Sequence, residues 1–321
     1  MRAPMALAVC AFLAGCAAVP KVNDTPPAQA SAQIEGASGP LTIPQSKALL
    51  EKVGNAGAVP MGYLVCGPVG TGKSFLAQCV SGEIGAPCVM LKNFRSKYVG
   101  ETEGNLERVL SVLRAMGPVV VVVDEADAAL GSREQDGDSG TSSRVFAMIA
   151  AQMGDTAYRG RIIWMLLTAR PDLLPIDLKR QGRAEVHIPL FYPTDEREIH
   201  QMFVILAKKL GSRVAIEDLP AIPQRGQLSG ADIEGMVGRA WRTSLLAGAD
   251  HITREALAEV IAQFLPSTQG LERELQETAA ILECTDRQFL PPAILEKVSA
   301  EGGRAQLQTR LTAIKQIVRE L

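Results

Sequence analysis

Short apolar runs recur through the first two thirds of the chain, at or near residues 62–66, 88–91, 119–123, 162–168 and 184–188. Runs of this length that are rich in valine, isoleucine and leucine are typical of strands buried on both faces of a sheet. The stretches between them show helical spacing of apolar residues, most clearly from about residue 104 to 116. Strands that alternate with helices predict an α/β fold with a doubly wound parallel sheet, whose ligand lies at the carboxyl ends of the strands.

The pattern changes near residue 193, and three regions follow from it. Residues 44–192 predict a large α/β domain, and residues 193–264 predict a small helical lid because they contain no strand-like run. In the lid, a helix over about 195–210 is expected to bury Ile199, Met202, Phe203, Leu206 and Leu210. Residues 265–321 predict a helical extension with an apolar stripe at Leu307, Leu311, Ile314 and Ile317. This extension either packs on the lid or binds a partner, and packing is the favoured alternative.

Composition narrows the range of partners. Hydrophobic residues make up 47% of the chain, as in a folded protein, and the net charge is -2. This balance does not indicate nucleic acid as a partner, and an aromatic content of 4% argues against a surface that stacks bases. The six cysteines form no C-x-x-C pair and the three histidines have no metal-ligand spacing. We expect the cysteines to be reduced, with Cys66 and Cys88 inside buried strands.

A glycine-rich loop follows the first apolar run directly. It matches the pattern G-x-x-x-x-G-K-[ST] in full and leads into an apolar helix, which is the context that a phosphate-binding loop requires. A glycine-rich turn with a chance Lys-Ser pair, the alternative, does not account for that context. Lys73 would reach the β- and γ-phosphates of ATP, and Ser74 would offer its hydroxyl to Mg²⁺. The predicted ATP-binding residues are Gly67, Pro68, Val69, Gly70, Thr71, Gly72, Lys73 and Ser74.

Two carboxylates follow the valine-rich run at 119–123. Asp124 is expected to hold Mg²⁺, and Glu125 to orient and polarise an attacking water. Carboxylates at the tip of an apolar strand are costly unless a cation or water surrounds them. The alternative, a strand end with solvated acids, loses weight because the glycine-rich loop precedes it.

With these motifs in place, residues from about 60 to 264 resemble a AAA+ ATPase module of the classical AAA clade, the group of proteasomal ATPases, metalloprotease motors and segregases. Arg170-Pro171-Asp172 resembles the second homology region of that clade, and residues 178–183 resemble its arginine-finger segment. The resemblance implies a hexamer in which Arg180 and Arg183 reach the γ-phosphate held by the neighbouring subunit. Two solvated arginines on a loop are the alternative.

A further match lies at residues 228–233, which resemble the start of the lid helix that closes over the nucleotide. The resemblance implies nucleotide contacts at Gly230 and Ala231. From the residues alone, Ser229 is a good N-cap and Asp232 completes a capping box, which any helix start would use.

Residues 97–101 resemble the central-pore loop of the members that thread polypeptides. The resemblance implies that Tyr98 grips an unfolded protein substrate. Without it, a tyrosine packed within a loop is the favoured interpretation. The polar, glycine-rich segment 131–143 is a candidate for a second loop facing the same pore.

The chain departs from the family pattern at Ala169. The family usually has asparagine there, which helps to position the attacking water, and an alanine side chain cannot form that hydrogen bond. Thr168 is expected to point to the other face of the strand. This departure puts the hydrolysis rate in question more than nucleotide binding. Residues 45–53 are a candidate for the adenine-side helix, although no adenine contact is assigned.

The amino-terminal residues 1–16 resemble a bacterial lipoprotein signal that ends at Cys16, and residues 17–43 have the composition of a linker. Three interpretations are open: a true signal with a lipidated Cys16, an apolar element at the edge of the ATPase domain, or a wrong start. The ATPase motifs favour a cytoplasmic module because ATP is available there.

The sequence therefore predicts one of two functions. The first is Mg-ATP hydrolysis in a ring that remodels or unfolds a protein substrate, with Lys73, Glu125, Arg180 and Arg183 as catalytic residues. The second is a nucleotide-gated scaffold that hydrolyses little, which Ala169 favours. A DNA-directed motor is disfavoured because the chain has no basic tract.

Overall fold

The computed structural model describes residues 59–91, 99–131, 139–223, 225–266 and 270–320, and in the first residues of two helices (99–102 and 139–143) only the backbone. The signal-like segment 1–43, the helix expected at 45–53 and Tyr98 lie outside the described residues. In the part of the chain that is described, no helix is both long and apolar enough to cross a membrane.

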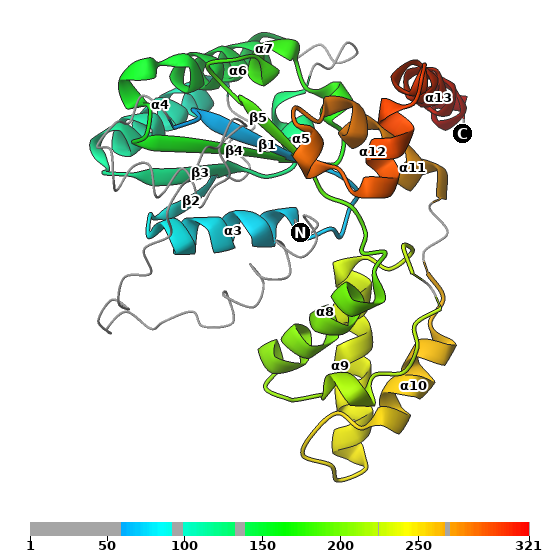
Figure 1. Cartoon of the computed structure of the whole chain (residues 1–321). Coiled ribbons are helices and arrows are strands. Elements are labelled where there is room, and N and C mark those ends of the chain that lie inside the picture. The colour runs from blue at the N-terminus through cyan, green and yellow to red at the C-terminus, as the bar shows by residue number, and fades with distance from the viewer. Residues whose placement is uncertain (1–58, 92–98, 132–138, 224, 267–269, 321) are drawn as a thin grey trace, which may run out of the picture.

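A parallel sheet forms the centre of the larger domain (Figure 1). Its strands lie in the order β2-β3-β4-β1-β5, and every neighbouring pair is parallel. The bounds are β1 (Gly62–Cys66), β2 (Cys88–Leu91), β3 (Val119–Val123), β4 (Ile162–Thr168) and β5 (Val186–Pro189). The predicted α/β class and the positions of the strands are confirmed, because fully buried parallel strands leave a nearly continuous apolar signature.

Helices cover both faces of this sheet (Figure 1). Alternate side chains of β3 divide between two cores: Val121 packs in the cluster that includes Leu110 and Ile149, whereas Val120 packs with Ala77 and Val80. The helices of this domain are α3 (Lys73–Ile84), α4 (Val99–Ala115), α5 (Ala126–Leu130), α6 (Ser139–Gly154) and α7 (Ile176–Lys179), with 3-10 turns η2 (Thr156–Tyr158) and η3 (Pro171–Leu173). This two-faced burial fixes the register of each strand, since a shift by one residue would exchange the two faces.

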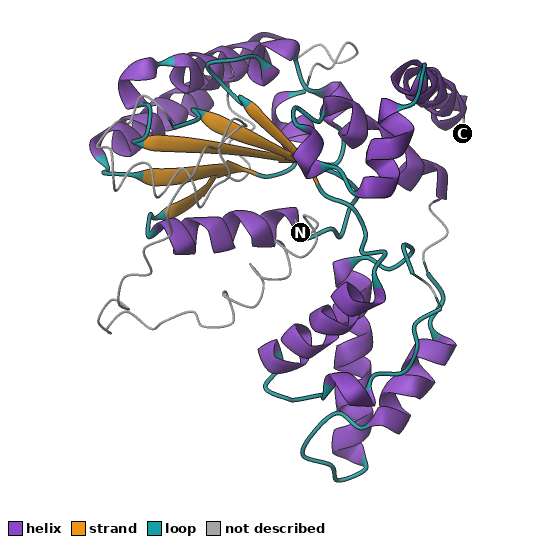
Figure 2. Cartoon of the chain, viewed as in Figure 1, coloured by secondary structure: helices purple, strands orange, loops and turns teal. Residues whose placement is uncertain are grey.

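The lid is a helical lobe beside the sheet domain, without strands in its described residues (Figure 2). It comprises α8 (Glu196–Lys209), α9 (Gly230–Leu246), α10 (Arg254–Gln263) and the turn η4 (Ile216–Asp218). Phe203, Met236 and Leu257 lie at the centre of its core. Leu210 was expected inside but is 37% exposed, because α8 has already ended and the chain turns away there.

The carboxyl-terminal extension consists of α11 (Gly270–Glu283), η5 (Arg287–Phe289), α12 (Pro292–Ser299) and α13 (Gly303–Glu320). It packs chiefly on the α/β domain, and it also reaches the lid, where Arg273 donates to the carbonyl oxygen of Gly226 at 3.2 Å. Ala280 joins one core of the sheet and Phe289 joins the other. Thr285 Oγ1 accepts a hydrogen bond of 2.9 Å from the N–H of His187, so the extension covers the outer edge of β5.

Besides Leu210, four local expectations were wrong. Cys88 is exposed rather than buried, because β2 is an edge strand of the sheet. Helix α4 begins at residue 99, five positions before the expected start, and α6 already begins at residue 139, inside the expected loop 131–143. On α13, Ile317 is 40% exposed and Val318 packs on the core in its place, because the stripe drifts around the helix.

Candidate functional site

The glycine-rich loop between β1 and α3 has a backbone that only glycine adopts easily. Gly67, Gly70 and Gly72 have φ values of 142°, 82° and 86°. A Cβ at Gly67 would lie 2.1 Å from the carbonyl oxygen of Leu190, so the loop passes directly against the segment after β5. Within the described residues, the N–H groups of residues 70–74 donate to no protein acceptor. Consecutive free N–H groups in this conformation form a concave site for an anion.

Lys73 and Ser74, at the start of α3, supply the side-chain groups of the loop. Lys73 Nζ donates to the carbonyl oxygens of Gly67 and Pro68 at 2.7 and 2.8 Å, so the ammonium lies across the loop. Burial is the main cause that lowers the pKa of Lys73 to about 8. Ser74 Oγ donates to Asp124 Oδ2 at 2.7 Å, which joins the end of β1 to the end of β3.

Glu125 is the one non-glycine residue with positive φ among the described residues, at 48°. Its backbone N–H donates to Asp124 Oδ1 at 3.0 Å, and its side chain is exposed. A left-handed glutamate costs on the order of 1–3 kcal/mol, and such strain is concentrated at functional sites. The carboxylate of Glu125 is thus exposed beside the end of β3, next to Asp124.

The end of β4 lies between the two strands that carry the loop and the acid pair. Thr168 is 1% exposed, and its Oγ1 donates to Asp127 Oδ1 at 2.6 Å and accepts the N–H of Arg170 at 2.9 Å. Its hydroxyl is therefore committed to the site's own structure and does not replace the missing amide at Ala169. Alternation along β4 places Ala169 on the α3 side of the sheet, the side of Val122 and so of Asp124.

The lid reaches the loop through the start of α9. The N–H of Gly230 donates to the carbonyl oxygen of Gly70 at 2.9 Å, and a Cβ at Gly70 would lie 2.7 Å from Cβ of Ser229 and 3.8 Å from Cβ of Ala231. The predicted capping box of Ser229 and Asp232 is confirmed. Gly230 and Ala231 are thus brought to the glycine-rich loop, as expected for residues that would contact its ligand.

The two candidate finger arginines differ in their surroundings. Arg180 has a side chain that is 57% exposed, and its Nε donates to Asp177 at 3.3 Å. Arg183 is only 14% exposed, and its Nη1 donates to the carbonyl oxygen of Asp177 at 2.7 Å. Within the described residues, neither arginine is bonded to the glycine-rich loop. Arg180 is therefore the better placed of the two to act outside its own subunit.

Two contacts to the loop were not predicted from the sequence. Gln276 of α11 accepts the N–H of Val69 at 3.1 Å, and Tyr192 Oη donates to the carbonyl oxygen of Val69 at 2.8 Å. The guanidinium of Arg273 lies 5.5 Å from the centre of the Tyr192 ring. No motif marks these residues, since a lone glutamine on an amphipathic helix has no pattern of its own.

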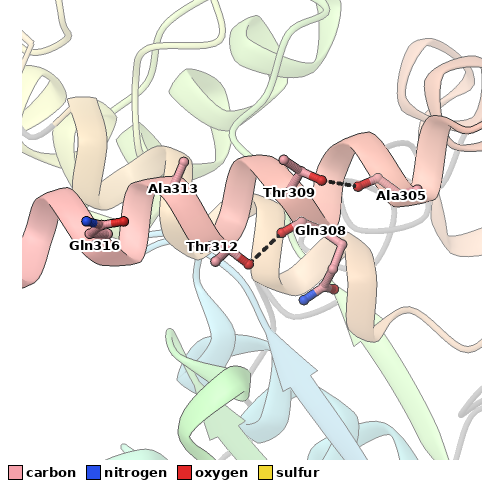
Figure 3. Close-up of a pocket in the computed structure, with 6 residues that line it drawn as sticks. All are labelled: Ala305, Gln308, Thr309, Thr312, Ala313 and Gln316. Carbon is pink, nitrogen blue, oxygen red and sulfur yellow. Dashed lines mark hydrogen bonds between the residues drawn. The ribbon is translucent and has the colours of Figure 1, made fainter.

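A hollow of about 580 Å³ lies on the surface of α13 (Figure 3). One helix alone lines it, with Ala305, Gln308, Thr309, Thr312, Ala313 and Gln316. The hydroxyls of Thr309 and Thr312 donate to carbonyl oxygens one turn earlier in the same helix. This hollow therefore presents no convergent chemistry, and the glycine-rich loop remains the candidate site.

The groups at that loop fit a magnesium-bound nucleoside triphosphate. The free N–H groups and Lys73 suit phosphate oxygens, and the oxygens of Ser74 and Asp124, 2.7 Å apart, suit a hard cation that keeps several water ligands. Glu125 stands next to them as the only exposed carboxylate of the pair. Adenine contacts are not identified among the described residues.

Comparison with known proteins gives an independent result. Residues 63–192 match the model of the "ATPase family associated with various cellular activities (AAA)". The chain is 34% identical over 235 residues to the "Cell division cycle protein 48 homolog" of Archaeoglobus fulgidus, covering 71% of this chain and 31% of that protein. It is 31% identical over 234 residues to "ATP-dependent zinc metalloprotease FtsH 3" of Sphaerobacter thermophilus, covering 70% of this chain and 47% of that protein.

A third relative is the "Proteasome-activating nucleotidase" of Methanothermobacter thermautotrophicus, 29% identical over 241 residues, which are 73% of this chain and 56% of that protein. In these three alignments the chain spans from about a third to somewhat over half of the length of the relative. The similarity therefore concerns the ATPase module that the proteins share.

Proposed function

We propose, from the premise that residues 63–192 are a domain of the AAA family of ATPases, that this chain binds Mg-ATP and hydrolyses it to ADP and phosphate. The observation that carries the proposal is the pairing of Ser74 Oγ with the Asp124 carboxylate, 2.7 Å apart, beside residues 70–74, whose N–H groups donate to no acceptor among the described residues. A serine and an aspartate in this arrangement provide the two protein oxygens of a magnesium site, and the remaining ligands are phosphate and water.

Each site residue has a distinct task in this proposal. The loop N–H groups and Lys73 hold the β- and γ-phosphates and neutralise charge that develops on the transferred group. Ser74 and Asp124 hold Mg²⁺, which supplies Lewis-acid stabilisation of the phosphate oxygens when bound. Glu125 orients a water molecule and accepts its proton. The start of α9 closes the site because Gly230 is bonded to Gly70.

The proposal includes a ring oligomer in which Arg180 completes the site of a neighbouring subunit. Its support is that the Arg180 side chain is 57% exposed and, among the described residues, forms no hydrogen bond with the glycine-rich loop of its own subunit. The relatives carry names of protein-processing machines, namely a metalloprotease and a proteasome-activating nucleotidase. We therefore infer a protein substrate, with Tyr98 as the residue that grips it, and a cytoplasmic module that draws on cellular ATP.

ATP turnover per subunit is expected to rise with protein concentration, because a site that needs a neighbour's guanidinium is complete only in the oligomer. Arg180→Ala should lower turnover by about 1,000-fold or more at saturating concentration while leaving ATP affinity within a few-fold. The measurement is phosphate release by residues 41–321 with Mg²⁺ over a range of protein concentrations. Arg287→Ala, a change at an arginine of η5 in the extension, serves as the control.

Turnover that is independent of concentration and unaffected by Arg180→Ala would exclude catalysis by a neighbouring subunit. Clear ATP binding without turnover at any concentration would instead support the second candidate, a nucleotide-gated scaffold.

The second candidate rests on Ala169, which leaves the attacking water without an amide at the end of β4. Ala169→Asn is therefore expected to raise turnover several-fold, since a new hydrogen-bond partner on the side of Asp124 would help to orient that water. Single-turnover phosphate release measures this, with Ala169→Val as a control of similar size that cannot hydrogen-bond. An unchanged or lower rate in the asparagine variant would mean that another group already orients the water.

A further inference from the structure

Helix α11, in the carboxyl-terminal extension, is bonded directly to the glycine-rich loop. Gln276 is 7% exposed, and its Oε1 accepts the N–H of Val69 at 3.1 Å. Its Nε2 donates to Glu272 Oε1, one helical turn earlier, at 3.1 Å. The amide of Gln276 is therefore fixed at both ends, and its orientation is determined by a donor on one side and an acceptor on the other.

The same helix also reaches the end of β4. Glu272 Oε1 lies 3.9 Å from Arg170 Nη1, and Arg170 forms a two-bonded pair with Asp172, at 3.0 Å for each bond. The N–H of Arg170 donates to Thr168, whose hydroxyl is bonded to Asp127 beside the acid pair. One turn of α11 therefore connects the phosphate side of the site with its carboxylate side.

Helix α11 packs against α13, and α13 is in turn bonded to the turn η3. Leu275 and Ala279 are 0% and 1% exposed and pack against Leu311 and Ile314 of α13. Lys315 of α13 forms an ion pair of 2.8 Å with Asp172. Burial alone would raise the pKa of the Asp172 carboxyl, but the bonds from Arg170 and Lys315 outweigh it and hold that pKa below its ordinary value.

We propose that Gln276 is a positioning residue for the phosphate-binding loop, so that the carboxyl-terminal helices are part of the ATPase site. This inference rests on the proposed function. Val69 immediately precedes the residues whose N–H groups face the phosphates, and its own side chain is 64% exposed and makes little packing contact. The hydrogen bonds of Val69 to Gln276 and Tyr192 therefore hold the loop immediately before those residues.

A loop that is already in its binding conformation before ATP arrives contributes equally to binding of ATP and to binding of the transition state for its hydrolysis. Loss of the Gln276 contact should therefore raise KM and the Kd for ATP by about three- to ten-fold and change kcat by less than about two-fold. A residue that merely stabilised the fold would lower the fraction of active protein and hence the apparent kcat, with KM unchanged.

The test compares Gln276→Met, which keeps the length of the side chain, with Gln308→Met on the exposed face of α13 as the matched control. Val69→Pro removes the N–H donor from the other side of the contact and completes a double-mutant cycle. The measurements are the Kd of a fluorescent ATP analogue, KM and kcat, and amide hydrogen exchange of the loop peptide in nucleotide-free protein.

In the wild-type background, we expect Gln276→Met to weaken nucleotide binding and to speed amide hydrogen exchange of the loop peptide. In the Val69→Pro background, we expect the same substitution to have no further effect on nucleotide binding. Equal effects of Gln276→Met in both backgrounds, or a fall in kcat alone, would overturn the positioning role. If the wild-type chain binds no ATP analogue, the proposed function fails. In that case hydrogen exchange still tests whether Gln276 holds the loop. Unchanged exchange of the loop peptide in Gln276→Met would show that it does not, whatever the chain binds.

Discussion

Glu125→Gln is expected to lower ATP turnover on the order of 100- to 10,000-fold while the site retains ATP. The amide has the size of the carboxylate but cannot accept the proton of the attacking water. Because the Glu125 side chain is exposed and is hydrogen-bonded to neither Ser74 nor Asp124 among the described residues, the bond between those two, proposed to hold magnesium, should survive the change. Steady-state phosphate release and chromatography of the bound nucleotide measure the two halves of this prediction.

Glu301→Gln, at an exposed acidic residue beside α13, is the matched control and should leave turnover unchanged. A Glu125→Gln protein that turned over ATP at the wild-type rate would remove Glu125 from the mechanism. Asp127, two residues further along the chain, would not be a ready replacement, since its Oδ1 already accepts the hydroxyl of Thr168.

Trp164→Ala is expected to reduce the free energy of unfolding by about 3–5 kcal/mol. Trp164 is 1% exposed at the middle of β4, among the largest fully buried side chains of the described residues. Its ring belongs to the core cluster that includes Leu110 and Ile149, so its removal leaves a cavity inside that cluster. Urea unfolding followed by circular dichroism measures the loss.

Ile176→Ala provides the contrast, because Ile176 is 81% exposed and its truncation should cost less than about 0.5 kcal/mol. A loss below about 1 kcal/mol for Trp164→Ala would show that the core at β4 collapses around the missing ring or is not packed as described. Turnover should fall together with stability in Trp164→Ala, since β4 lies between the strand that carries the phosphate loop and the strand that carries the acid pair.

The sequence by itself determined the elements that local pattern specifies. All five strands lie where the apolar runs predict, because a strand buried on both faces requires an uninterrupted series of apolar residues. The capping box of Ser229 and Asp232 also follows from local spacing, since its hydrogen bonds join residues within one turn. The glycine-rich loop and the acid pair could also be located from local sequence, because each is a pattern of a few consecutive residues; the ligands assigned to them stay a prediction.

Only the tertiary structure decided contacts between segments that are distant in the sequence. The exposure of Cys88 depends on the sheet order, which leaves β2 at an edge, and no feature of the run itself encodes that order. The bond of Thr168 to Asp127 and the bond of Gln276 to Val69 join residues that are 41 and 207 positions apart. A hydrogen bond between residues so far apart in the sequence needs only one donor on one element and one acceptor on another. A single donor or acceptor leaves no periodic signal in the sequence. The packing of α11 against β5 brought Gln276 to the loop, and that packing became visible only once both elements were placed in space.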